Sequence, residues 1–182
     1  VIDDRGGVAA DSLLVRIGSE NHLPTPPQIN GPMIGMKQTG YSFTVASTDA
    51  DSDSLRYLVH WGDQTQNEST VLPDGTRWNV SHSWAASGKY LISATASDAT
   101  TMSNPGIWTI YINVTSVGSL GFLFDANGDE IVDSFHENAT GVDTAVQRLE
   151  NGSLLFSAGS LQYLFNPSNG ALIAQGGHST GS

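Results

Sequence analysis

The chain has 182 residues, no cysteine, and 18 acidic against 7 basic residues, which gives a formal net charge of -11 at pH 7. Binding to phosphate needs clustered cations, so this balance argues against a nucleic-acid partner and disfavours an anionic membrane surface. No run of residues has the length and apolar character of a membrane-spanning helix. Gly is abundant, and Asp outnumbers Glu and mostly stands beside Gly, Asn or Ser. The composition therefore predicts an all-β protein rich in turns.

Residues 1–18 end in an alternating segment in which Leu13, Val15 and Ile17 share one face. This segment parallels residues 97–112, which also begin with Asp in a polar loop and finish in an alternating strand. We predict that residues 1–18 are the terminal strand of another β-sandwich. That sandwich either precedes in the same polypeptide or belongs to a neighbouring chain, where the segment acts as a donated assembly strand.

Residues 19–32 contain four of the seven prolines, which predicts a stiff, extended linker. Beyond it, short segments alternate apolar and polar residues, with turn-forming Gly, Pro, Asp and Asn between them. These segments are residues 41–45, 55–61, 78–84, 90–96 and 108–114. Regular short strands of this kind are typical of a β-sandwich, which we place at residues 27–116. Residues 120–176 are predicted to form a small β-hairpin repeat unit, and residues 177–182 a flexible tail.

The loop at residues 125–133 reads DANGDEIVD and is flanked by predicted strands. Alternating oxygen donors are typical of calcium loops, and here they are Asp125, Asn127, Asp129, the main-chain carbonyl of Ile131, and Asp133. Their spacing predicts a calcium site in a hairpin. A solvated turn rich in Asp and Asn is the alternative.

A second acidic cluster comprises Asp49, Asp51 and Asp53, in a loop between two predicted strands. Alternating aspartates in a loop can bind calcium at a junction between modules. An ordinary Asp-rich turn with solvated charges is the competing interpretation.

Five Asn-x-Ser/Thr sequons predict N-linked glycans at Asn67, Asn79, Asn113, Asn138 and Asn151. Asn79 and Asn113 alternate with inward-facing residues of predicted strands, so both are expected to face solvent. The other three lie in predicted loops. Unmodified surface asparagines remain the alternative.

Several motifs of the central segment occur in a fixed order. They are YSFTV at 41–45, TDADSDSL at 48–55, WGDQT at 61–65, SHSW at 81–84, GKY at 88–90 and ATASD at 94–98. Together they resemble the polycystic-kidney-disease (PKD) family of immunoglobulin-like β-sandwiches. That family usually has a second glycine in the WGDQT turn, where this chain has Gln64. The expected fold is thus an all-β, PKD-type sandwich flanked by an orphan N-terminal strand and a small C-terminal β-hairpin unit.

The resemblance implies architecture, because PKD modules act as spacers, adhesion units and surface-layer building blocks of archaeal and bacterial extracellular proteins, without catalytic residues. The chain also has no nucleophile motif, and its five histidines are scattered. We therefore predict a non-enzymatic structural subunit of an extracellular glycoprotein layer, fibre or adhesin stalk. Its partners would be copies of itself or neighbouring modules, and its cofactors calcium and N-linked glycans. An accessory carbohydrate- or protein-binding module of a secreted hydrolase is the alternative.

Overall fold

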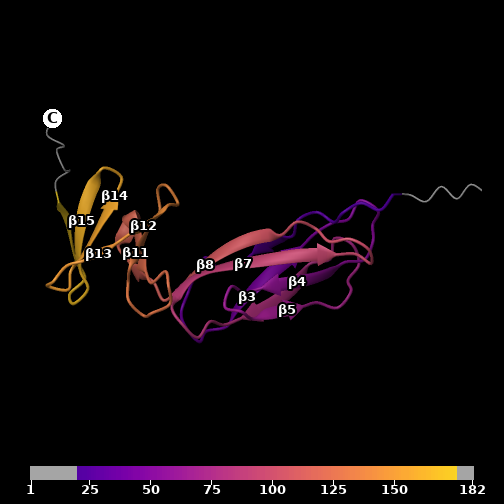
Figure 1. Ribbon diagram of the computed structural model, residues 1–182, viewed down its shortest axis with the longest axis horizontal. Helices are drawn as coiled ribbons and strands as arrows, with labels where there is room; N and C mark the ends of the chain where they lie inside the picture. The colour runs from indigo at the N-terminus through magenta and orange to yellow at the C-terminus, as the bar shows by residue number, and fades with distance from the viewer. Residues whose placement is uncertain (1–19, 176–182) are drawn as a thin grey trace, which may run out of the picture.

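The computed structural model describes residues 20–175, which form two β units joined end to end into an elongated body (Figure 1). Residues 1–19 and 176–182 lie outside the described part. The predicted assembly strand with Leu13, Val15 and Ile17, and the predicted tail at 177–182, therefore fall outside it as well. Within residues 20–175 no helix has the length and apolarity needed to cross a membrane.

The first unit is a β-sandwich, which confirms the predicted fold class. One sheet has three strands in the order β1-β3-β6, and the other has five in the order β2-β8-β7-β4-β5. Neighbouring strands are antiparallel except β2 and β8, which are parallel. The strands are β1 (Gln28–Asn30), β2 (Ile34–Gly35), β3 (Tyr41–Ala46), β4 (Arg56–His60), β5 (Gln66–Glu68), β6 (Trp78–His82), β7 (Gly88–Ser97) and β8 (Gly106–Ile112).

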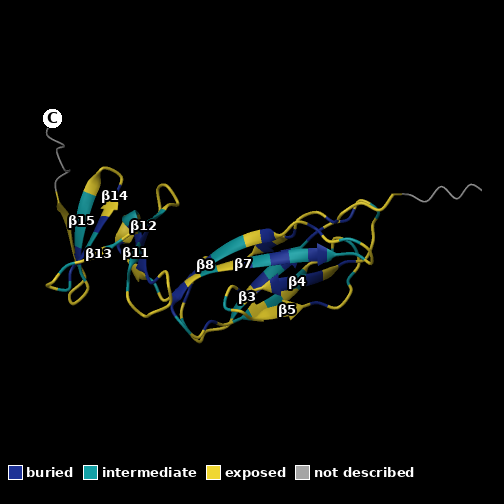
Figure 2. Cartoon of the chain, viewed as in Figure 1, coloured by how far each residue is buried: buried dark blue, intermediate teal, exposed yellow. Residues whose placement is uncertain are grey.

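The core of the sandwich follows the predicted alternation. Phe43 and Val45 of β3 are buried, and Ile92, Ala94 and Ala96 of β7 are buried opposite them. Half-buried residues stand between buried ones along the central strands (Figure 2). Because side chains of a strand point alternately to its two faces, this pattern leaves one apolar layer between the sheets.

The chain changes sheets at the end of the predicted linker. Residues 28–30 pair with β3 as strand β1, and residues 34–35 pair with β8 in the opposite sheet. Gly31 lies at this crossing, and a Cβ atom there would stand 2.1 Å from Cδ1 of Phe43. Part of the predicted linker is therefore an edge strand of the sandwich. Proline is tolerated in and beside edge strands.

The second unit consists of two four-stranded antiparallel sheets, ordered β12-β11-β10-β9 and β13-β14-β15-β16. Phe135, Phe156 and Phe165 meet in the core between them. The first of its strands, β9, pairs with β10, so residues 115–116 belong here rather than to the end of the sandwich. The elements are β9 (Thr115–Ser116), the 3₁₀ helix η1 (Gly118–Leu120), β10 (Gly121–Phe124), β11 (Ser134–Glu137), β12 (Asp143–Ala145), β13 (Gln147–Arg148), β14 (Leu154–Ala158), β15 (Leu161–Asn166) and β16 (Ala171–Gln175).

Candidate functional site

Three aspartates converge in the loop between β3 and β4. Asp49, Asp51 and Asp53 each place one carboxylate oxygen within 4.8 Å of the other two. No other group of three or more His, Asp or Glu side chains in residues 20–175 comes together in this way. A turn produces the convergence, because the N–H of Ser52 donates to the carbonyl of Asp49 and Ser52 has a φ of 61°. The three aspartates are called the aspartate trio below.

Asp49 lies at the base of the trio and is only 6% exposed. Its Oδ1 accepts hydrogen bonds from the backbone N–H groups of Asp51, at 2.8 Å, and of Asp53, at 3.5 Å. Its Oδ2 is buried and has no hydrogen-bond partner. One oxygen of this carboxylate thus organises the loop, whereas the other is free.

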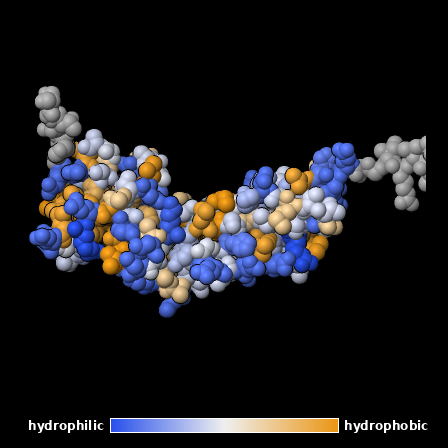
Figure 3. Space-filling model, viewed as in Figure 1, coloured by the Kyte–Doolittle hydropathy of each residue, from blue (hydrophilic) through white to orange (hydrophobic). Residues whose placement is uncertain are grey.

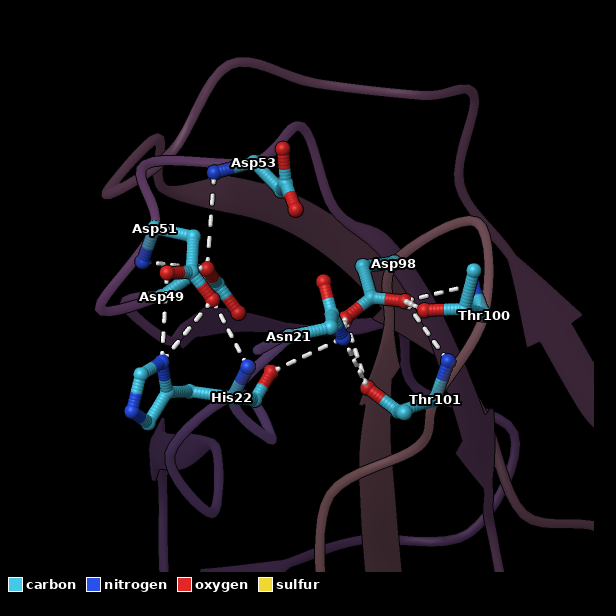
Figure 4. Close-up of polar contacts among 8 residues, drawn as sticks. All are labelled: Asn21, His22, Asp49, Asp51, Asp53, Asp98, Thr100 and Thr101. Atoms are coloured by element: carbon cyan, nitrogen blue, oxygen red, sulfur yellow. Dashed lines mark hydrogen bonds and ion pairs between the residues drawn. The ribbon is translucent and has the colours of Figure 1, made fainter. Parts of the chain in front are cut away.

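The segment that leads into the sandwich lies against the trio (Figure 4). The backbone N–H of His22 donates to Oδ2 of Asp51 at 2.7 Å, and Nδ1 of His22 lies 3.1 Å from both Asp51 oxygens. These contacts, the backbone bond first, lower the pKa of Asp51, while the negative charge of Asp98 acts in the opposite direction. The trio is therefore anchored to the segment around residue 22.

Asn21 and Asp98 extend this cluster toward the end of β7. The amide of Asn21 donates to Oδ2 of Asp98 at 3.0 Å. Hydrogen bonds from the Thr101 hydroxyl, from Asn21 and from two backbone N–H groups hold the pKa of Asp98 far below its usual range. No sequence pattern indicated that these residues are members of a site. The Asp98 loop was visible as a turn, but the contact between Asn21 and Asp98 spans 77 positions and leaves no local signal.

The predicted calcium loop at 125–133 is a hairpin loop between β10 and β11, but its first aspartate is committed to other contacts. Asp125 is 3% exposed, and its carboxylate accepts from the N–H groups of Asn127, Gly128 and Glu130 and from the hydroxyl of Ser87. These bonds lower its pKa although burial alone would raise it.

The other predicted ligands of this loop also cap its backbone. Asn127 accepts from the N–H of Asp129, Asp129 accepts from the N–H of Ile131, and Asp133 accepts from the N–H of Ala126. The side-chain oxygens of the loop therefore accept hydrogen bonds from backbone N–H groups of the same loop. Calcium binding in this loop stays a prediction.

The same loop connects the second unit to the sandwich through a hydrogen bond and an ion pair. Oγ of Ser87 lies 2.7 Å from Oδ2 of Asp125, and Nζ of Lys37 lies 2.6 Å from Oε2 of Glu130. Glu130 has a φ of 68°. It therefore holds a backbone conformation that favours glycine. Its carboxylate nevertheless reaches both Lys37 and the N–H of Ser87.

A second group of contacts completes this connection. Tyr111 of β8 packs against Phe122 and Phe124 of β10, with ring centroids 4.9 Å apart in both pairs. Its hydroxyl donates to Asp143, which also accepts from Nζ of Lys89 and lies 2.6 Å from Nδ1 of His136. These two groups together are called the junction below. Its members are Lys37, Ser87, Lys89, Tyr111, Phe122, Phe124, Asp125, Glu130, His136 and Asp143.

All five predicted glycan acceptors are exposed, at Asn67, Asn79, Asn113, Asn138 and Asn151. Two positions differ in detail from the sequence expectation. Asn67 lies in edge strand β5 rather than in a loop, and its Oδ1 accepts from the indole N–H of Trp61 at 2.7 Å. Asn113 follows the end of β8 with a φ of 64°, so it faces solvent through a turn and not through strand alternation.

No aromatic side chain in residues 20–175 is fully exposed. In residues 20–175 every Trp, Tyr and Phe is buried or half-buried, and the exposed apolar residues are aliphatic or Met. On the face drawn in Figure 3 these residues lie in several separate groups.

Comparison with known proteins found a likeness between this chain and a solved PKD domain. The PKD domain of an M14-like peptidase from Thermoplasmatales archaeon SCGC AB-540-F20 is 30% identical, with a TM-score of 0.50. The likeness covers 50% of this chain and 97% of that domain. That share of the chain is larger than the whole C-terminal unit, which spans residues 115–175.

Two further solved structures are more distant. The sulfur carrier protein SoxY from Chlorobium limicola f thiosulfatophilum is 13% identical, with a TM-score of 0.40 over 50% of this chain and 86% of that one. The SrpA adhesin from Streptococcus sanguinis is 12% identical, with a TM-score of 0.34 over 84% of this chain and 93% of that one.

A scan against protein-family models and a search of curated proteins found no match. The family assignment rests on the M14-like peptidase's PKD domain, together with the observed sandwich and its ordered motifs. Through its β1–β8 sandwich, this chain belongs to the PKD-domain family of immunoglobulin-like modules.

Proposed function

We propose that this chain is a non-catalytic spacer segment of an extracellular surface assembly, such as a surface layer, a fibre or an adhesin stalk. The observation that carries the proposal is the junction, where the carboxylate of Asp143 joins Tyr111 and Lys89 of the sandwich to His136 of the C-terminal unit. Paired charges and packed rings resist bending between the units. Two small modules fixed end to end are suited to spanning distance (Figure 1).

Surface chemistry supports the same role. A net charge of -11 favours solubility, and five exposed sequons offer sites for glycans. Asn67 and Asn79 lie on β5 and β6, which are edge strands of the two sandwich sheets. Glycans there would block unwanted pairing of sheet edges.

The proposal is tested on intact producing cells. Antibodies raised against residues 20–175 should label whole cells as strongly as lysed ones, and small-angle scattering of the purified chain should give an elongated particle. Labelling only after lysis would contradict a surface location. A compact or broadly bent scattering profile would contradict a stiff spacer.

A more specific form of this proposal is that copies of the chain polymerise by strand donation. Residues 11–17 of one chain would add to an edge strand of a second chain, as in β-augmentation. Strands β5 and β16 are edges of their sheets. Deleting residues 1–18 should abolish multimers in sedimentation experiments. If the multimers persist after deletion, strand donation is wrong, while the spacer role is unaffected.

An accessory module of a secreted hydrolase is the second candidate, favoured by the likeness to a PKD domain of an M14-like peptidase. It requires a binding surface for polysaccharide or protein. The absence of an exposed aromatic ring from residues 20–175 weighs against carbohydrate. Calorimetry with cellulose and chitin oligosaccharides, and with a denatured protein substrate, should show no binding if the spacer proposal holds.

A further inference from the structure

The two sheets of the C-terminal unit are covered to different extents. Strand β10 of the first sheet is buried along its whole length, because Phe122 contacts Tyr111 of the sandwich and Leu123 faces the second sheet. The second sheet, β13-β14-β15-β16, packs against the first with Leu154 and Phe156. It lies on the far side of the first sheet from the sandwich, at the end of the body (Figure 1). Its other face is therefore directed away from the sandwich.

An aliphatic row crosses this other face, which is called the outer face below. Leu155 pairs with Leu164, and Leu164 pairs with Ile173, so the three side chains share one face. Ile173 is 57% exposed, the two leucines are half-buried, and none of the three belongs to a buried cluster of residues 20–175. Continuous apolar runs, here LLF at 154–156 and YLF at 163–165, are typical of strands that are covered on both faces. The outer face therefore has the composition of a packing surface.

The rest of the outer face carries no charge. The residues that share it with the aliphatic row are Gln147, Ser157, Gln162, Asn166, Ala171 and Gln175. Amides and hydroxyls both donate and accept hydrogen bonds, so a rim of this kind can pair with an identical rim, whereas charged groups would meet their like. Two chains of net charge -11 repel each other, and an uncharged face is where their approach costs least. The outer face is therefore complementary to itself.

We propose that the outer faces of two copies of this chain stack on each other and form a two-fold dimer. Sheets stack face to face at about 10 Å, which is how the two sheets of the C-terminal unit already pack. A two-fold contact uses the same surface patch on both partners, so it requires the self-complementarity that the outer face has. The two elongated bodies meet at their C-terminal ends. This contact does not depend on the spacer role proposed above.

The size of the outer face sets the expected strength of the dimer. Four strands of about five residues cover about 19 Å by about 17 Å, or roughly 300 Å² on each copy. Stable protein interfaces bury about 800 Å² on each partner, so the dimer is weak, with a Kd on the order of 0.1 mM. Sedimentation equilibrium between about 10 μM and about 1 mM should then show the change from monomer to dimer. Raising the salt from about 0.05 M to about 0.5 M should strengthen the dimer, because salt screens the repulsion between the two acidic chains.

Substitutions in the aliphatic row test where the contact lies. Ile173→Lys places like charges across the contact and should weaken the dimer at least about tenfold. Leu164→Gln removes apolar area without adding charge and should weaken it in the same direction, which keeps the test decisive if Ile173→Lys fails to fold. Ile107→Lys is the matched control, because Ile107 is 52% exposed on strand β8 of the sandwich. It should leave the dimer unchanged.

Cross-linking tests which surface covers the outer face. The chain has no cysteine, so Leu164→Cys introduces a single thiol on β15, one of the two central strands of the sheet. A bismaleimide with a reach of about 15 Å should join two such chains across stacked sheets about 10 Å apart. Ile107→Cys should give no covalent dimer. In protein isolated from producing cells, linkage of Leu164→Cys only to a different sequence would overturn the second copy as the occupant.

The dimer is distinguishable from assembly by strand donation. Strand donation gives open-ended multimers of more than two copies, whereas a two-fold contact closes with two. Deleting residues 1–18 should therefore leave the dimer intact. The inference is wrong if the chain stays monomeric up to about 1 mM, if salt dissociates the dimer, or if Ile107→Lys weakens it as much as Ile173→Lys does. A surface location found by antibody labelling would stand in each of these cases.

Discussion

Gln64 holds a position in the WGDQT turn that glycine usually occupies in the family. Its φ of 71° lies in the left-handed region, so the turn keeps its shape although the residue type differs. The turn survives because its neighbours are fixed: Asp63 accepts from the N–H and the hydroxyl of Thr65, and lies 2.7 Å from Nε2 of His82. His82 in turn stacks on Trp61 with ring centroids 4.7 Å apart.

Replacing Gln64 by glycine is therefore expected to stabilise the protein. A left-handed conformation costs a non-glycine residue roughly 1–2 kcal/mol, and glycine loses about 0.5–1 kcal/mol of extra chain entropy, so the net gain is about 0.5–1 kcal/mol. Urea unfolding of Gln64→Gly measures it. Gln66→Gly, in edge strand β5, is the matched control and should destabilise by a similar amount. If Gln64→Gly destabilises the protein as much as Gln66→Gly does, the backbone at Gln64 is not strained.

At the scale of elements, the first edge of the sandwich depends on a close approach. Strands β1 and β2 belong to opposite sheets, and only three residues separate them. The ring of Phe43 fills the space beside Gly31 and is itself 1% exposed, so it cannot move aside. A side chain at this crossing would push β1 away from β3.

The variant Gly31→Ala should thus destabilise the sandwich by about 1–3 kcal/mol, the usual cost of overpacking a core. The measurement is the shift of the urea midpoint at constant slope. Gly40→Ala serves as control, because a Cβ atom at Gly40 meets nothing within 4 Å. A neutral Gly31→Ala would show that β1 is not held against Phe43 in solution.

At the scale of the whole molecule, the junction determines whether two small units behave as one body. Burial raises the pKa of Asp143, but hydrogen bonds from Lys89, His136 and Tyr111 outweigh it and bring the pKa below the usual range. Burial, with the charge of Asp143 next to it, raises the pKa of the Tyr111 hydroxyl, which stays protonated and able to donate. The junction therefore depends on an ionised Asp143.

Acid should weaken the junction. The folded-state pKa of Asp143 lies below the unfolded value of about 3.9, so its stabilisation is complete above that pH and is lost as the pH falls through the folded pKa. The variant Asp143→Asn should cost about 1–3 kcal/mol at pH 7 and should flatten the loss of stability as the pH falls below about 4. Thermal unfolding across this range measures both. Glu150 is an exposed carboxylate, so Glu150→Gln should leave the dependence of stability on pH unchanged. If Asp143→Asn also leaves this dependence unchanged, Asp143 does not stabilise the junction.

Much of the sandwich could be predicted from local patterns. Alternation along residues 41–45 and 90–96 fixes which side chains face the core, because strand side chains have a period of two. The aspartate trio was also visible, since its members are separated by single residues. Asn21 and Asp98 were not, because only folding brings the linker beside the end of β7.

The sequence by itself determined the all-β class, the PKD-type sandwich, the two-part C-terminal unit and the presence of two acidic loops, because each depends on residues close together in the chain. Only the tertiary structure decided how the two loops differ. Asp125 meets Ser87, 38 positions away, and its carboxylate is saturated, whereas Asp49 is buried by the sandwich with one oxygen left free. An aspartate at similar spacing thus connects the two units in one loop and is a candidate cation ligand in the other. The difference arises because distant parts of the chain determine how deeply each aspartate is buried and which groups donate hydrogen bonds to it.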